Sequence, residues 1–389
     1  MEVGGSVKVV HAAKFYPPYV GGMETFLQYL CDGTAGEWDV RVVAANDSGT
    51  TVHERVGRVR VTRAAALGVV ASVSLCPTLP LHLWRERADC VVVHEPNPVA
   101  GAALLLRTPA PRLIVWHHSD LVRPWWASHT YGRAQRALYR RADCVVVTNP
   151  VAAAQSPLVR CASRVAVIPL GVDLQRYRAL TPAQLARAQQ IRRETPGPVV
   201  LFVGRLVYYK GLDVLIHAMR DCPATLLIAG EGPLEAELRR LASARDLERR
   251  IMFAGGVSDE DLPAYYHASD VFVLPSVAPT EAFGLVQVEA MASGVPVVST
   301  NLPTGVPWVN QHDVTGLVVP PRDAASLAAA LRRLIDDRPL ARAMGERGRK
   351  RAEAVFSRER TVEAFKTLVE TTVRTPELLD RRLAQAEPI

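Results

Sequence analysis

Several features that define common protein classes are missing from this sequence of 389 residues. No two of its six cysteines are separated by just two residues, so the sequence has no CxxC pair. A zinc knuckle or a dithiol redox motif is therefore not expected. Several cysteines, among them Cys90 and Cys144, lie in apolar, strand-like runs. We therefore expect reduced, buried thiols in a cytosolic protein.

Long hydrophobic segments are also missing. The first residues show no positively charged start followed by an apolar core of signal-peptide length. The longest uncharged stretch, residues 64–83, contains Gly68, Pro77 and Pro80. A membrane-spanning helix needs about 20 strongly apolar residues without such breakers. We interpret this stretch as a proline-bearing loop with short apolar segments.

The balance of charge is moderately basic. Lys and Arg number 46 and Asp and Glu 39, which gives a net charge of +7. This favours an acidic partner, such as nucleic acid, an anionic membrane or a phosphorylated substrate, although an ordinary basic protein fits as well. A nucleic-acid-binding protein predicts one concentrated basic stripe with aromatic platforms. Here the arginines are dispersed and balanced locally by Glu, which argues against that class.

The arrangement of apolar runs indicates the fold class. Hydrophobic residues make up 49% of the chain, enough for a large core, and short β-branched runs alternate with helix-like segments throughout. This pattern is typical of parallel sheets covered on both faces, here in two doubly wound α/β domains. An eight-stranded barrel fits less well, because residues 173–198 are polar, Arg-rich and strand-free, as in a linker. Residues 324–368 show helical spacing of leucines.

Two cations follow a predicted strand in the second half of the chain. The run 199–203 leads into Gly204-Arg205-Leu206-Val207-Tyr208-Tyr209-Lys210-Gly211. Open α/β sheets bind ligands outside the carboxyl ends of their strands. Arg205 and Lys210 are therefore candidates to neutralise a diphosphate, and a solvated loop is the alternative.

Two glutamates eight positions apart form a second candidate element. A helix is expected to begin near Phe283 and Gly284, between Glu281 and Glu289. Eight residues of helix rise about 12 Å, too far for a hydrolase pair, which needs about 5–9.5 Å. The two carboxylates would instead touch two parts of one long ligand, with the free N–H groups of Gly284 and Leu285 facing a phosphate. The alternative is one capping and one surface Glu.

Three shorter features admit two interpretations each. Gly21 and Gly22 precede a helix, which suits either an anion at the helix end or a plain turn. His118 follows a strand and would accept from or orient a hydroxyl; a metal site at two adjacent histidines lacks a third ligand. Ser258 and Asp261 fit a helix cap better than a metal site.

Together these motifs resemble the retaining glycosyltransferases of family 4. The resemblance covers nearly the whole chain in motif order: Gly21-Gly22, residues 168–173, 204–211, 230–233 and the pair Glu281 and Glu289. The set formed by His118-Ser119-Asp120, residues 281–287 and residues 302–307 resembles the bacterial mannosyl and rhamnosyl transferases of exopolysaccharide and O-antigen assembly.

The resemblance implies an α/β fold of the GT-B type, with two doubly wound Rossmann-like domains facing across a cleft. Residues 1–172 would form the acceptor-side domain, joined by a C-terminal helix within residues 358–389. Residues 173–357 would form the sugar-nucleotide-binding domain.

The resemblance also implies roles for individual residues. Glu281 would contact the transferring sugar, His118 would contact the donor sugar near the reacting centre, and Asp120 would orient it. Arg205 and Lys210 would bind the diphosphate and Glu289 the ribose hydroxyls. The remaining donor-binding candidates are Gly21, Gly22, Gly230, Glu231, Val257, Phe283, Gly284 and Leu285.

The family needs no catalytic metal and no cofactor besides the nucleotide-sugar substrate. The subgroup likeness suggests GDP-mannose as donor and a glycan or polyprenyl-diphosphate-linked acceptor; a UDP-sugar transferase and a GT-B sugar-nucleotide epimerase are the alternatives. A catalytically dead scaffold is disfavoured because the motif residues are present. Residues 121–141, with Trp125, Trp126 and several arginines, suit the cytoplasmic face of a membrane or, alternatively, a basic helix packed inward.

Overall fold

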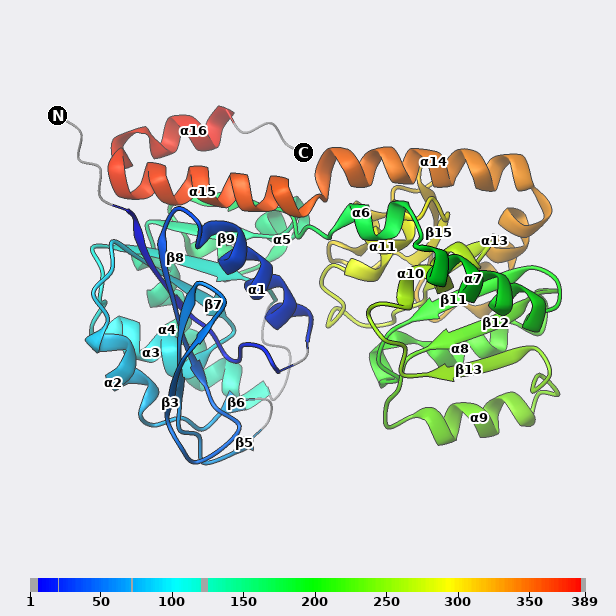
Figure 1. Cartoon of the computed structure of the whole chain (residues 1–389), viewed down its shortest axis with the longest axis horizontal. Coiled ribbons are helices and arrows are strands. Elements are labelled where there is room, and N and C mark those ends of the chain that lie inside the picture. The colour runs from blue at the N-terminus through cyan, green and yellow to red at the C-terminus, as the bar shows by residue number, and fades with distance from the viewer. Residues whose placement is uncertain (1–5, 20, 71–72, 120–124, 386–389) are drawn as a thin grey trace. The chain divides into compact units, whose positions relative to one another are not determined.

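The computed structural model describes residues 6–19, 21–70, 73–119 and 125–385, and the chain divides into two compact units (Figure 1). Unit 1 comprises Met1–Leu170 together with Arg358–Ile389, and unit 2 comprises Gly171–Ser357. The first division therefore falls after Leu170, where the sequence suggested residue 172.

Unit 1 is built on an eight-stranded sheet with the strand order β10-β9-β8-β7-β1-β2-β4-β3. Its strands are β1 (Lys8–Ala12), β2 (Asp39–Ala45), β3 (Val52–Val56), β4 (Val59–Ala64), β7 (Cys90–Glu95), β8 (Arg112–His117), β9 (Cys144–Val147) and β10 (Val165–Val167). Neighbouring strands are parallel except β3, which pairs antiparallel with β4 at the edge. The short turn between β3 and β4 makes this antiparallel pairing possible, because parallel neighbours need a long crossover.

Helices cover both faces of this sheet (Figure 1). On one face α1 (Gly22–Thr34) packs against α15 (Arg358–Arg374), which returns from the end of the chain. On the other face α3 (Pro98–Leu106) packs against α2 (Leu79–Arg85) and α4 (Trp125–Arg141). The remaining helices of unit 1 are α5 (Pro150–Gln155), α16 (Leu379–Gln385) and the short η1 (Val159–Cys161) and η3 (Pro376–Leu378).

The stretch 64–83, expected to be a loop, contains more structure than that. The ribbon of β5 (Val69–Val70) and β6 (Val73–Ser74) lies within it, and α2 begins at Leu79 with Pro80 in its first turn. Proline is compatible with a first helical turn because the N–H group that it lacks has no partner inside the helix. Pro80 therefore starts a helix here rather than breaking one.

Unit 2 is built on a fully parallel sheet of six strands in the order β13-β12-β11-β14-β15-β16. Its strands are β11 (Val199–Val203), β12 (Thr225–Ala229), β13 (Ile251–Gly255), β14 (Val271–Leu274), β15 (Val297–Thr300) and β16 (Gly316–Val319). Its helices are α6 (Leu174–Arg178), α7 (Pro182–Glu194), η2 (Tyr208–Lys210), α8 (Leu212–Ala218), α9 (Glu235–Ser243), α10 (Leu262–His267), α11 (Leu285–Ala292), α12 (Val306–Val309), α13 (Ala324–Asp336) and α14 (Arg338–Val355).

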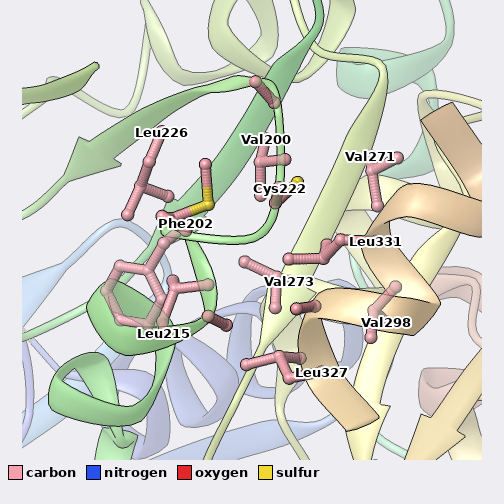
Figure 2. Close-up of a cluster of buried hydrophobic side chains, with 14 of the residues drawn as sticks. Val200, Phe202, Leu215, Cys222, Leu226, Val271, Val273, Val298, Leu327 and Leu331 are labelled. Carbon is pink, nitrogen blue, oxygen red and sulfur yellow. The ribbon is translucent and has the colours of Figure 1, made fainter. Parts of the chain in front are cut away.

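One face of this sheet packs against α8, α9 and α13 and forms the core of unit 2 (Figure 2). Val200, Phe202 and Val273 point from the strands toward Leu215 of α8 and Leu327 of α13, and all five are buried. The strands β11, β12, β14 and β15 are buried along their whole length, which explains their nearly continuous apolar runs, as the sequence pattern predicted.

The segment 173–198 is not the extended linker that its polar composition suggested. It forms α6 and α7, and α7 packs against α10 within unit 2. Thr181 and Gln184 form a capping box at the start of α7, and Ala188 and Ile191 are its buried apolar side chains. A helix with such a narrow apolar stripe has mostly polar residues, which explains why composition alone suggested a linker.

Candidate functional site

Both sheets have a topological switch point, where the chain leaves one side of its first strand and continues on the other. In unit 2 this point lies between β11 and β14, and in unit 1 it lies between β1 and β7. Ligands of open α/β sheets bind outside the carboxyl ends of the strands at such points. We describe the two ends separately, beginning with unit 2.

Lys210 and Glu281 meet at the switch point of unit 2. Lys210 ends the loop after β11, Glu281 lies in the loop after β14, and Nζ and Oε2 are 2.6 Å apart. Both side chains are about nine-tenths buried. Ser276, which is fully buried, donates its hydroxyl to the same carboxylate oxygen at 3.0 Å. The sequence identified both charged residues but neither their ion pair nor Ser276.

The close approach of the loops that carry Lys210 and Glu281 depends on a glycine. Gly211 has φ +69°, and a Cβ there would lie 2.2 Å from the carbonyl oxygen of Pro275. Any larger residue would push apart the two loops that bring Lys210 and Glu281 together. Arg205, the second predicted cation, lies earlier in the same loop with an exposed side chain.

The helix predicted near Phe283 begins at Leu285, with Gly284 as its N-cap in the left-handed region at φ +74°. The Gly284 N-cap offers no side chain, and no side-chain cap hydrogen bond is present at this end. Phe283 is buried against Trp308 and Phe356, and this packing fixes the turn that leads into α11. This leaves first-turn N–H groups of an eight-residue helix available to an anion, as predicted for Leu285.

Glu289, on α11, is surrounded by tyrosines that the sequence did not single out. The Tyr266 hydroxyl donates to Oε2 at 2.7 Å, and Tyr177 also hydrogen-bonds this carboxylate. Burial raises the pKa of Glu289, whereas the two hydroxyls act in the opposite direction. A carboxylate offers about four acceptor positions. Glu289 therefore retains the capacity to accept hydrogen bonds from a ligand diol.

The two loops that carry the donor-binding candidates Gly230, Glu231 and Val257 are joined to each other. Gly230 N–H donates to the Gly255 carbonyl at 2.7 Å, and Gly256 N–H donates to Oε1 of Glu231 at 3.0 Å. Val257, which follows directly, is partly exposed. Glu231 thus has a structural role in tying the two loops, in addition to the binding role predicted for it.

In unit 1 the glycine pair opens α1 as predicted, with Gly21 as N-cap. A Cβ on Gly21 would lie 2.2 Å from Oε2 of Glu24, so this carboxylate lies over the helix end where an anion was expected. Glu24 also raises the pKa of nearby Lys14, although burial lowers it more. Gly22 is exposed, and space beside it is open.

His118 is the end of a chain of three histidines. His94 Nδ1 lies 3.0 Å from His118 Nε2, and His94 Nε2 lies 3.1 Å from His11 Nδ1. His11 and His94 come from the ends of β1 and β7, so the chain spans the switch point of unit 1. Burial lowers the pKa of His11 and of His118 to about 3 and that of His94 well below its ordinary value. His118 itself is partly exposed, whereas His11 and His94 are buried.

The adjacent residue, Glu95, points to the other face of the sheet, as strand alternation requires. Its carboxylate is fully buried and accepts hydrogen bonds from the Tyr131 hydroxyl at 3.1 Å and from Gln135 Nε2 at 2.9 Å. Burial raises its pKa to about 6, against these hydrogen bonds. Gly101 is required for this contact, because a Cβ there would lie 2.1 Å from the Tyr131 hydroxyl.

A pocket lies beside the switch point of unit 1, lined in part by Lys14, Ser74 and Asn97. The Asn97 Oδ1 caps α3 by accepting from Ala100 N–H, and Asn97 Nδ2 has no partner among the described residues. Ser74 Oγ is likewise buried without a partner among the described residues. Two buried polar atoms without a partner among the described residues, Asn97 Nδ2 and Ser74 Oγ, therefore belong to residues that line this pocket.

Two predictions concern residues outside the described part of the chain. Asp120 lies there, as do residues 121–124 of the predicted membrane-facing segment, and the side chains of Trp125 and Trp126 are not described. Within the described part of that segment, Arg141 donates to the carbonyls of Leu104 and Leu105. This arginine closes the C-terminus of α3, which is a structural use of part of the basic cluster.

Among the described residues, no group of three or more His, Cys, Asp or Glu is arranged to hold a metal ion. Ser258 and Asp261 instead hydrogen-bond each other in the turn that leads into α10, and Asp261, the N-cap of this helix, makes no side-chain cap hydrogen bond. In the same part of the chain, none of the helices is both long and apolar enough to cross a bilayer. All six cysteines are free, and five of them are buried.

The residues that sequence reasoning missed share a signal that was available. His11, His94 and Glu95 are polar residues at the ends of otherwise apolar strands, which is the same position that drew attention to His118. Ser276 follows β14 in the same way. Tyr177 and Tyr266 carry no such signal, because they reach Glu289 from helices.

Two family profiles match the chain. The one described as Glycosyltransferase Family 4 matches residues 20–176, and the one described as Glycosyl transferases group 1 matches residues 185–351.

Curated relatives match along nearly the full length. The O-antigen chain mannosyltransferase C of Escherichia coli is 30% identical, with 95% of this chain and 100% of that protein covered. A GDP-mannose-dependent alpha-(1-6)-phosphatidylinositol monomannoside mannosyltransferase of Mycobacterium tuberculosis is 32% identical, with 88% and 92% covered.

Among solved structures, the sucrose-phosphate synthase of Thermosynechococcus elongatus superposes with a TM-score of 0.78 at 26% identity, with 94% of this chain and 99% of that chain covered. The two Rossmann-like units and this likeness confirm the predicted GT-B fold. The chain belongs to glycosyltransferase family 4 and is a hexosyltransferase.

Proposed function

We propose that the protein is a retaining transferase that moves mannose from GDP-mannose to a glycan or lipid-linked oligosaccharide in cell-surface polysaccharide synthesis. The observation that carries the proposal is the buried Lys210–Glu281 pair at the switch point of unit 2. It combines a cation suited to a diphosphate with a carboxylate suited to a sugar. The names of the two mannosyltransferase relatives support the choice of sugar.

The chemistry follows from charge. Departure of the nucleoside diphosphate builds negative charge on phosphate oxygens. The Lys210 ammonium and the exposed Arg205 guanidinium would stabilise that charge, together with the N–H groups at Gly284 and Leu285. Lys210 is held in place by Glu281, so it needs no large rearrangement when charge develops. Attack by the acceptor hydroxyl on the face that the leaving group vacates would retain the anomeric configuration.

The other donor contacts are assigned in the same way. Glu289 would accept hydrogen bonds from the ribose hydroxyls, held for this by Tyr266 and Tyr177. Glu281 would contact the transferring sugar. In unit 1, His118 would contact the donor sugar, and Gly22 would approach the phosphates. No catalytic metal is required in this proposal, because the cations act where Mg²⁺ acts in other sugar-nucleotide enzymes.

The acceptor would bind to unit 1. The pocket lined by Lys14, Ser74 and Asn97 supports this, because its unpartnered polar groups suit hydroxyl or phosphate oxygens. A lipid-linked acceptor would place the enzyme at the inner face of the plasma membrane, as a peripheral protein of the cytoplasm. Flotation with liposomes that contain anionic lipid tests this location: we expect the protein in the lipid fraction, and its absence there contradicts membrane binding.

A donor screen tests the proposed substrate. A bound donor stabilises the fold by mass action, by about 2.7 kcal/mol at a hundred times its Kd. We expect GDP-mannose to raise the melting temperature more than UDP-glucose or UDP-N-acetylglucosamine. Release of GDP that depends on added acceptor then distinguishes a transferase from an epimerase, which needs no acceptor. A larger shift with a UDP-sugar contradicts the assigned donor, and release of nucleoside diphosphate without an acceptor contradicts the assigned reaction.

A further inference from the structure

The three histidines at the switch point of unit 1 form one continuous hydrogen-bonded row. His11 Nδ1 and His94 Nε2 are 3.1 Å apart, and His94 Nδ1 and His118 Nε2 are 3.0 Å apart. Consecutive rings are tilted by only 31° and 21°. His94 uses both of its nitrogens, so it couples the outer two rings.

All three rings are neutral at physiological pH, because burial disfavours their protonated forms. A neutral imidazole has one N–H donor and one acceptor nitrogen. His94 must therefore donate to one neighbour and accept from the other. Only two arrangements of the protons satisfy both hydrogen bonds, one pointing toward His118 and one toward His11.

The far end of the row decides between them. Nε2 of His11 is buried and has no partner among the described residues, and its ring packs beside Phe365 of α15. If the bonds point toward His11, this nitrogen carries an unpartnered N–H. If they point toward His118, it carries only a lone pair. Buried N–H groups without partners are the rarer case in proteins, so the second arrangement is favoured.

We infer that His11 and His94 are positioning residues that hold His118 in the tautomer protonated at Nδ1. His118 then presents an N–H donor to a ligand instead of a basic lone pair. Its partner is an oxygen that accepts a hydrogen bond, such as a hydroxyl oxygen of the donor sugar. The tautomer follows from the hydrogen-bond geometry of three neutral rings, whereas its use in transfer rests on the proposed function.

Nitrogen NMR tests the tautomer directly. In the full-length protein labelled with ¹⁵N-histidine, long-range ¹H–¹⁵N correlations distinguish a protonated from a bare ring nitrogen, and His118→Gln assigns the signals of His118. We expect His118 to be protonated at Nδ1 and bare at Nε2 throughout pH 6–8. Protonation at Nε2, or at both nitrogens in this range, overturns the inference.

Substitution of the far ring tests the coupling. His11→Leu removes the donor to His94 without touching His118. We expect His118 to populate both tautomers, and kcat to fall about threefold to tenfold with little change in the KM for the donor. His94→Gln supplies an amide donor toward His118, and we expect it to retain the Nδ1-protonated form. An unchanged His118 spectrum in His11→Leu overturns the relay and leaves His11 a packing residue.

His53→Leu is the matched control, because His53 is an exposed histidine of the same unit on β3. We expect it to change neither the spectrum of His118 nor turnover. If His11→Leu does not fold, the spectrum of the unsubstituted protein still decides the tautomer. The spectra need no substrate, so a wrong tautomer and a wrong proposed function give separate negative results.

Discussion

The two switch points have the same place in their sheets but opposite chemistry. That of unit 2 holds full charges, a buried ammonium and carboxylate 2.6 Å apart. That of unit 1 holds neutral imidazoles, because burial lowers the pKa of His11 and His94. A buried group stays ionised only when an opposite charge or hydrogen-bonding groups lie beside it. The switch point of unit 2 is therefore sensitive to the loss of one charged partner, whereas that of unit 1 is sensitive to pH.

The largest expected effect comes from removing one charge in unit 2. Lys210→Ala leaves Glu281 buried and unpaired and removes the cation proposed for the diphosphate. We expect kcat to fall by at least about a hundredfold to a thousandfold, and unit 2 to lose about 3 kcal/mol of stability. Steady-state kinetics and urea unfolding measure the two effects.

A double substitution separates stability from catalysis. Lys210→Met together with Glu281→Gln removes both charges at nearly unchanged volume, so the stability lost in Lys210→Ala should return. Activity should not return, because both chemical groups are gone. A double variant with substantial turnover would refute the site assignment in unit 2.

The next effect is the acid sensitivity of unit 1. The folded-state pKa of His11 is about 3, below the unfolded value of 6.5. Its contribution to stability is therefore complete above pH 6.5 and is lost as the pH falls. Below pH 6.5, the free energy of unfolding falls by about 1.4 kcal/mol per pH unit for each histidine that stays neutral in the folded protein.

Tryptophan fluorescence follows unit 1 selectively, because Trp38, Trp84, Trp116, Trp125 and Trp126 lie in it and only Trp308 lies in unit 2. Urea unfolding at pH 7.5, 6 and 5 should show the loss, and His11→Leu should reduce its slope. An equal slope in His11→Leu would contradict the assignment of this pH dependence to the histidine row.

Glu95 gives unit 1 a pH dependence of stability that is opposite in sign to that of the histidines. Its pKa is raised from 4.5 to about 6 by burial, so its contribution to stability is complete below pH 4.5 and is lost as the pH rises through 6. Glu95→Gln removes the ionisation, and Gln135 can turn its amide to keep a hydrogen bond. The variant should match the wild type at pH 4.5 and exceed it by about 2 kcal/mol at pH 7.5. Equal stabilities at both pH values would show that folding does not raise the pKa of Glu95.

The smallest expected effect concerns the tyrosines around Glu289. Tyr266→Phe removes the hydroxyl that donates to this carboxylate. We expect donor affinity, measured by calorimetry, to weaken by about fivefold, which corresponds to about 1 kcal/mol. Tyr265→Phe is the control, since the Tyr265 hydroxyl accepts a hydrogen bond from Arg187 of α7, whereas Tyr266 is the neighbour that donates to Glu289. Equal losses in both variants would argue against a role of Glu289 in binding.

Much of the fold was predictable because its signals are local. The buried parallel strands of unit 2 are continuous apolar runs, and the glycine before α11 marks where that helix begins. Composition failed where burial is narrow or depends on a neighbour. The helix α7 buries little more than one stripe, and β3 is stabilised by pairing with β4 rather than by an apolar pattern.

The site residues also differ in whether local sequence predicts them. Lys210, Glu281 and Glu289 lie in contiguous motifs, so the sequence suggested them together. The row of His11, His94 and His118 is assembled from β1, from β7 and from the residue that follows β8. These segments lie far apart in the chain, and only the pairing of the three strands in one sheet makes the row a unit. Ion pairs and tautomers depend on distances of a few tenths of an ångström, which no residue pattern encodes.

The return of α15 to the first sheet has a consequence for the order of events during synthesis. Unit 2 is one uninterrupted segment and can fold as soon as it has left the ribosome. Unit 1 must wait, because Phe365 packs against His11 and Trp116, and Thr361 donates to the Pro169 carbonyl. The part of the enzyme that is translated first is thus completed last. A nascent chain of which residues 1–357 have left the ribosome would carry a complete unit 2 and a first sheet on which α1 lacks its neighbour α15.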